Sequence, residues 1–273
     1  MISPDRLLSV FSKFVDAPPL ESAPAAWTLA MSNGQPHSIR ARLDGDTLEL
    51  VTGPLPRDLP PACMLRANLA LPPPSRLVVT ASDALLLRAE IVLDENTQCD
   101  TVLAAALAAL RAGLDAAAGA PLPTLPTNEE PWDIERTAAE AGFEARPAAA
   151  GRYRVEFPER RSRAAFVGPG LTAEMEMLPP GEYPDPVRQA VATFLLRATS
   201  VIRFVRAAGG AEGGARLEVR FPAPPAPARM ESAMLALSLA GPRQEDVSVL
   251  TREDAARMYL AVCSHSISKG GDG

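Results

Sequence analysis

Histidine and serine are the first side chains to consider for catalysis in this sequence. Few of them have the spacing that a nucleophile–base pair needs. The 273 residues contain two histidines, His37 and His265. His37 begins a predicted strand beside a turn, where an ordinary surface position is the simpler interpretation. His265 lies between Ser264 and Ser266, but adjacency along a chain does not build a nucleophile–base pair. We therefore predict no catalytic residues and a protein that is not an enzyme.

The cysteines do not have the spacing of a metal site either. Cys63, Cys99 and Cys263 are far apart in the sequence, and no pair of histidines or cluster of carboxylates complements them. An odd number of cysteines without a basic, apolar leader is typical of reduced thiols in the cytoplasm. The longest apolar run, Val102–Leu110, is about half of what a membrane span needs. The sequence thus predicts a soluble, cytoplasmic protein without metal or other cofactors and without a membrane partner.

A glycine-rich segment, Gly209–Gly214, invites comparison with phosphate-binding loops. No Lys-Ser/Thr pair follows it, and it leads into a predicted strand rather than into a helix. The amide cradle and the helix dipole that hold a phosphate would therefore be missing. We interpret the segment as a flexible hairpin loop.

Two groups of residues are candidates for binding a partner. Arg160, Arg161 and Arg163 form the one basic cluster, for which a solvated hairpin turn is the simpler interpretation and a contact with an acidic or phosphorylated partner the alternative. Leu8, Phe11 and Phe14 lie at helical spacing near the N-terminus and can belong to the core or face a client. Met230 and Met234 share such a spacing too, and we expect them in the core.

The overall composition narrows the class of partner. Net charge is −6 at neutral pH and only 5% of residues are aromatic. A nucleic-acid surface needs a basic face to meet phosphates and, for single strands, aromatic rings to stack bases. We therefore predict that the protein does not bind nucleic acid.

Hydrophobic periodicity organises the first half of the chain into three helices and five strands. Ser3 and Pro4 are a typical helix start, and Asp44-Gly45-Asp46 is a typical hairpin turn. The predicted order is a helix containing Leu7–Val15, strands Trp27–Met31, Ser38–Leu43 and Thr47–Val51, a helix opened near Asp58, strands Leu77–Thr80 and Leu85–Leu93, and a helix from Thr97 to a glycine cap at Gly119.

The same order recurs in the second half. It predicts a helix from Pro131 to Gly142, strands Arg152–Phe157, Ala164–Val167 and Leu171–Leu178, a helix opened by Asp185, strands Val201–Arg206 and Arg216–Phe221, and a helix containing Met230–Leu237. Three pairs of helices agree on one offset, since Leu7 and Ile134, Asp58 and Asp185, and Leu103 and Met230 are each 127 residues apart. We therefore predict a tandem duplication with little residue identity between the halves.

These patterns predict the domain organisation. Residues 1–120 form the first module, 121–131 a proline-punctuated linker, 132–242 the second module and 243–273 a C-terminal extension. In the extension we expect a short strand at Glu245–Leu250, a helix from Thr251 to Ala261, and a frayed tail from Ser264.

An acidic module with the order α-βββ-α-ββ-α resembles the type III secretion chaperones of the Tir-chaperone class and the related YbjN-like modules. The resemblance is one of topology and pattern, and it covers nearly all of the chain. It implies an α+β fold in which two secretion-chaperone-like modules form an intramolecular pseudo-dimer, with a C-terminal helical extension. Because such chaperones work as homodimers, it also implies that the fused chain is a monomer.

The resemblance implies a function as well. Chaperones of this class hold a segment of a client or effector polypeptide in extended form, which a sheet edge can accept as an added strand. The expectation is thus a non-enzymatic protein-binding module. The alternative is a YbjN-like regulatory or scaffolding protein that binds folded partners.

Overall fold

The structure is a computed structural model of the whole chain. It describes residues 3–32, 36–56, 59–93, 99–117, 132–157, 160–168, 172–210, 213–220, 226–240 and 243–268. Within these residues every helix falls short of the length or the apolarity that crossing a bilayer requires. Contacts divide the chain into two compact units. One takes Met1–Asp58, Ala70–Val78 and Ala84–Leu125, and the other takes Leu59–Leu69, Val79–Asp83 and Pro126–Gly273.

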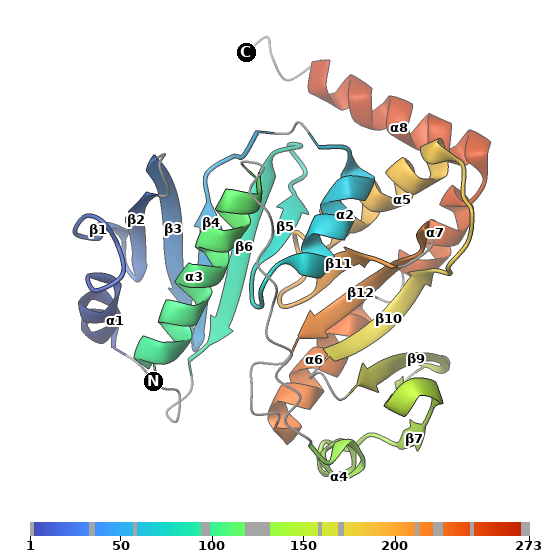
Figure 1. The fold of residues 1–273 in the computed structure, drawn as a ribbon, viewed down its shortest axis with the longest axis horizontal. Coiled ribbons are helices and arrows are strands. Elements are labelled where there is room, and N and C mark those ends of the chain that lie inside the picture. Colours follow the sequence, from blue (N-terminus) through green and yellow to red (C-terminus); the bar gives the residue numbers. More distant parts are fainter. Residues whose placement is uncertain are drawn as a thin grey trace. The chain divides into compact units, whose positions relative to one another are not determined.

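The first unit is an antiparallel sheet with helices on one face (Figure 1). Its elements are α1 (Pro4–Phe11), β1 (Leu20–Ala23), β2 (Ala26–Ser32), β3 (Pro36–Asp44), β4 (Thr47–Thr52), β5 (Arg76–Val79), β6 (Leu85–Val92) and α3 (Cys99–Ala117). Ser3 caps α1 by accepting a hydrogen bond from the Arg6 amide, as its sequence predicts. Phe11 of α1 packs on Trp27 of β2, with ring centroids 5.6 Å apart.

The second unit repeats this architecture and adds helices. Its elements are α2 (Pro61–Ala70), α4 (Ile134–Glu140), β7 (Ala145–Pro147), a 3-10 turn (Ala149–Gly151), β8 (Tyr153–Phe157), β9 (Arg160–Gly168), β10 (Thr172–Leu178), α5 (Asp185–Ala198), β11 (Arg206–Gly209), β12 (Ala215–Arg220), α6 (Pro227–Ala240), α7 (Arg243–Leu250) and α8 (Glu253–Ser268). Met230 and Met234 of α6 are fully buried in its core, as expected.

Strand order confirms the duplication. The first sheet runs β1-β2-β3-β4-β6-β5 and the second β7-β8-β9-β10-β12-β11 from the corresponding edge. In both sheets the last two strands of the module are placed in reverse order, because the final strand inserts beside the fourth. The protein is therefore α+β, with two similar six-stranded antiparallel sheets in sequential halves and helices at the C-terminal end.

Helix α2 departs from the expected partition. It lies in sequence between β4 and β5 of the first sheet, yet its contacts group it with the second unit. The Ala62 amide donates to Gln189 Oε1 of α5 at 3.2 Å, and Asn68 Nδ2 donates to the Ala207 carbonyl of β11 at 2.8 Å. Gly209 of β11 lies directly beneath α2, because a Cβ there would be 3.4 Å from the Arg66 amide nitrogen. The second unit is thus completed by a helix from the first half of the sequence.

Three predictions of secondary structure are wrong. Glu245–Leu250 is not a strand but lies in α7, where Val247 and Leu250 are three residues apart and both buried. Residues 201–205 are not a strand, since β11 begins only at Arg206 and Phe204 has a φ of +63°. Short edge strands, β1 and β7, precede the three predicted strands of each module, so each sheet has six strands rather than five.

Several sequence predictions concern residues outside the described part of the chain. These are the helix starts at Asp58 and Thr97, the Gly119 cap, the 121–131 linker and the end of the chain after Ser268. Residues 264–268 continue α8, which replaces the fraying predicted from Ser264.

Candidate functional site: the open sheet faces and the exposed edge

The sheet face opposite the helices is polar in the first unit. Along β3, Ile39 and Ala41 are buried while Ser38, Arg40 and Arg42 are exposed, the alternation of a strand with one covered face. Cross-strand register extends this outer face over four strands, because residues directly opposite each other share a face. One such row joins Arg42, Glu49 and Glu90.

Glu49 and Glu90 stand directly opposite each other on β4 and β6, an arrangement that is unfavourable for like charges. Arg88 resolves the repulsion, since its Nη2 lies 2.5 Å from Glu49 Oε1 and 2.9 Å from Glu90 Oε1. Arg76 of β5 completes the cluster through an Nη1–Oε2 contact of 2.9 Å with Glu90. Arg76 and Glu90 are both buried, so each depends on the other for compensation.

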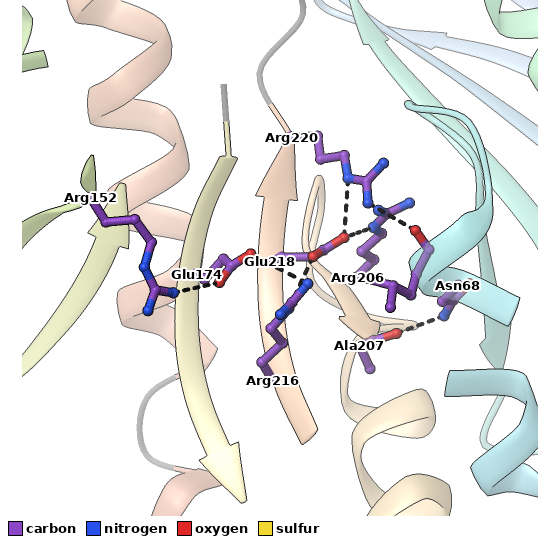
Figure 2. Close-up of polar contacts among 9 residues, drawn as sticks. Asn68, Arg152, Glu174, Arg206, Ala207, Arg216, Glu218 and Arg220 are labelled. Carbon is purple, nitrogen blue, oxygen red and sulfur yellow. Dashed lines mark hydrogen bonds and ion pairs between the residues drawn. The ribbon is translucent and has the colours of Figure 1, made fainter. Parts of the chain in front are cut away.

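The second unit contains the same cluster at equivalent positions (Figure 2). Glu174 and Glu218 face each other on β10 and β12, and Arg206 of β11 pairs with Glu218. Arg216 bridges the two glutamates, with Nη2 3.4 Å from Glu174 Oε1 and Nε 3.3 Å from Glu218 Oε2. Each bridging arginine lies two residues before its glutamate on the final strand, in Arg88-Ala89-Glu90 and in Arg216-Leu217-Glu218. A repeated ion cluster therefore marks the duplication at the level of single side chains.

Two further arginines enlarge the second cluster. Arg220 Nε is 3.2 Å from Glu218 Oε1, and Arg152 Nη1 is 3.3 Å from Glu174 Oε2. Burial lowers the pKa of Arg206 to about 10; Glu218 opposes this effect, and the neighbouring Arg220 and Arg216 add to it. Arg206 still carries its charge at neutral pH.

The second cluster also anchors α2. Arg220 Nη2 donates to the carbonyl of Leu69 at 2.9 Å, and Leu69 directly follows Asn68, which bonds to β11. A guanidinium at the C-terminal end of a helix satisfies a free carbonyl and complements the helix dipole. The buried charges of this unit therefore have a structural role, which is to hold α2 against the sheet.

The two edge strands of each sheet differ in how much of their surface is exposed. All four residues of β1 are exposed, and the Leu20 side chain is 68% accessible. By contrast, β5 and β11, at the other end of each sheet, are buried along their whole length. The strand β7 is mostly exposed but has only three residues and ends in Pro147, which has no amide hydrogen to donate. Among the described strands, β1 is the best edge for an additional strand.

The apolar candidates for partner binding differ in how far their side chains are buried. Phe11 is fully buried against Trp27 and belongs to the core of the first unit. Leu8 and Phe14 are half-buried. Whether either of them contacts a partner stays a prediction.

The basic candidates belong to a strand rather than to a turn. Arg160, Arg161 and Arg163 lie in the first half of β9, which corrects the interpretation of this cluster as a solvated hairpin turn. Phe157 pairs with Arg160 across the β8–β9 ladder. The side chains of these arginines lie outside the described part of the structure, so their proposed contact with a partner stays a prediction.

The glycine-rich segment has a packing role. Gly209 ends β11, and a Cβ on Gly213 or Gly214 would come within 3.0 Å of the Gly181 or Leu178 carbonyl oxygen. The segment borders a cleft of about 320 Å³, which Arg66 and Arg188 also line. Close packing therefore accounts for these glycines without a ligand.

The remaining chemistry candidates are not brought together. Cys63 and Cys263 are free thiols, and His37 lies half-buried on β3. Among the described residues, no group of three or more His, Cys, Asp or Glu side chains is arranged to hold a metal ion.

Comparison with known proteins adds no identification: no protein-family model, no curated protein and no solved structure matches this chain.

Proposed function

We propose that this protein is a non-enzymatic polypeptide-binding module that holds an extended segment of a client protein as a strand added to β1. The observation that carries the proposal is the exposed edge of the first sheet at Leu20–Ala23. An edge strand presents unpaired backbone amides and carbonyls, which an extended peptide pairs with regardless of most of its side chains. Leu20 adds an apolar contact beside these groups.

The doubled topology supports the same proposal. Each half of the chain has the order α-ββββ-α-ββ-α, which resembles that of a type III secretion chaperone with one short edge strand added. Chaperones of that class keep their clients extended, and β1 provides a place for such a client. A strand of four residues offers few hydrogen bonds, so we expect affinity for a single peptide in the micromolar range, about 10⁻⁶ M.

Peptides selected from an unbiased display library against the full chain test this proposal. Hydrogen exchange is measured with and without a selected peptide. Binding should slow exchange at residues 20–23, and Leu20→Lys should weaken it, whereas Val262→Lys on α8 should not. Peptides that bind without slowing exchange at β1, or a library that yields no peptide dependent on Leu20, would contradict the proposal.

A second candidate function is the binding of folded partners as a scaffold. It is favoured by exposed apolar side chains on the last two helices, Val249 on α7 and Met258 and Val262, which are four residues apart, on α8. A rigid helical surface suits a folded domain better than an extended strand. For folded proteins captured with the full chain from its own cell, this function predicts that Val262→Lys, and not Leu20→Lys, removes binding.

A further inference from the structure

We propose that the outer face of the first sheet selects acidic client segments through Arg40 and Arg42. This inference rests on the proposed function and names the chemistry of the client. Both arginines lie on β3, two strands from the β1 edge, and both side chains are exposed. A client strand added to the free edge of β1 is separated from β3 by β1 and β2, about 14 Å at the usual strand spacing, so the part of the client that crosses the outer face would meet the two arginines.

Charge is unbalanced on this face. Arg76 and Arg88 are engaged by Glu90 and Glu49 in the buried cluster. Neither Arg40 nor Arg42 forms an ion pair with an acidic side chain of the described residues, although Arg42 stands opposite Glu49 in the register. Four arginines thus share this face with three carboxylates, those of Glu49, Glu90 and the exposed Asp44. Since the whole chain carries a net charge of −6, the positive face is a local feature that attracts anionic groups.

The surrounding side chains leave the two guanidinium groups accessible. Thr28 and Val51 flank Arg40 in the register, and Ala26 is opposite Arg42. Ala30 and Ser38 continue the face as a further pair of small residues. Small residues let an extended backbone approach the sheet closely, and a carboxylate fits the forked donors of an arginine.

The same features disfavour a polynucleotide. The residues named on this face include no aromatic ring on which a base could stack. Two free arginines release few counterions, and the acidic remainder of the protein repels a long polyanion. An acidic polypeptide, with separated carboxylates, matches the face better.

Fluorescence anisotropy with the full chain and two short labelled peptides tests the proposal. One peptide alternates glutamate with serine, and the other has glutamine in place of glutamate. The wild type should bind the glutamate peptide more tightly, with an affinity that falls as salt is raised. Arg40→Gln with Arg42→Gln should weaken this binding about tenfold or more. The matched control is Arg111→Gln, an exposed arginine on the helical side of the same unit, and it should change the affinity by less than about twofold.

Four results would overturn the proposal: equal binding of the two peptides, a loss of binding in Arg111→Gln as large as in the double variant, tighter binding of a single-stranded RNA, or no binding of the glutamate peptide. The lysine pair, Arg40→Lys with Arg42→Lys, separates a charge effect from misfolding, because it should retain much of the affinity. If β1 is protected by library peptides while the glutamate peptide fails, only the acidic preference is lost and the polypeptide-binding function stands.

Discussion

Glu218 is the residue on which the polar interior of the second unit depends. It has no exposed surface, and Arg206, Arg216 and Arg220 all contact it. A buried charge is tolerated only when it is compensated, so removing the carboxylate of Glu218 takes from three guanidinium groups the charged partner that they share. Glu90 holds the corresponding position in the first unit with Arg76 and Arg88.

Glu218→Gln should therefore lower the free energy of unfolding by about 3–5 kcal/mol, measured by urea denaturation. Glu90→Gln should have a similar effect, because the cluster is repeated. Glu140→Gln serves as control, since Glu140 pairs with Arg136 on the surface of α4 and its loss should change stability by less than about 1 kcal/mol. Equal effects of Glu218→Gln and Glu140→Gln would show that the cluster has no structural role.

At the scale of elements, α2 is the least expected part of the fold. Its attachment to the second unit depends on a glycine beneath the helix and on three hydrogen bonds, donated by the Ala62 amide, Asn68 and Arg220. Asn68 is completely buried, so its amide has no access to water as a substitute partner.

Gly209→Ala should lower the free energy of unfolding by about 1–3 kcal/mol and speed hydrogen exchange in residues 61–70, because the added methyl group meets the backbone of α2. Gly168→Ala is the matched control on β9, where a Cβ would approach side-chain atoms no closer than 3.6 Å. If hydrogen exchange in α2 is equally fast in both variants, the contact with Gly209 does not hold the helix.

The helix α8 provides a prediction on pH. Its Tyr259 packs edge-on against Phe194 of α5, and burial, followed by the effect of Cys263, raises the pKa of Tyr259 to about 12. The folded protein therefore holds this phenolic proton more tightly than the unfolded chain does, so this contribution to stability is complete below about pH 10 and is lost as pH rises toward 12. Urea denaturation across this range should show a steeper alkaline decline for the wild type than for Tyr259→Phe. Parallel declines would contradict the raised pKa.

Sequence patterns predicted long elements well and short or tertiary features poorly. Helices α3, α5 and α6 have unbroken apolar stripes, so local periodicity is sufficient to predict them. The edge strands β1 and β7 have three or four residues and no buried face, so only pairing with a neighbour defines them. The segment Glu245–Leu250 alternates like a strand, but Val247 and Leu250 point to the same core only in a helix.

The candidate site was only partly visible in the sequence. The Arg-x-Glu pattern in Arg88–Glu90 and Arg216–Glu218 could have been found as a repeat, because the two copies are 128 residues apart. The face that bears Arg40 and Arg42 depends on cross-strand register, which no local pattern determines. The attachment of α2 to the second unit likewise follows from tertiary contacts alone.

At the scale of the whole molecule, the central feature is one architecture built twice. The shared strand order and the repeated ion cluster agree on this, although the halves share few residues. The modules resemble chaperones that work as homodimers, and this resemblance implies that the second module takes the place of a second copy.

We therefore expect the 28.8 kDa chain to be a monomer in gel filtration coupled to light scattering, at every protein concentration used. A stable dimer of the full chain would show that fusion does not replace dimerisation.

The most direct test of the central claim is photo-crosslinking in the cell of origin, with benzoylphenylalanine placed at Leu20 or, as control, at Arg111. The polypeptide-binding proposal predicts that the Leu20 probe crosslinks to one larger protein through a continuous, extended segment, and that the Arg111 probe does not. Crosslinks from Leu20 only to surfaces of folded domains, or at the level of the Arg111 control, would contradict it.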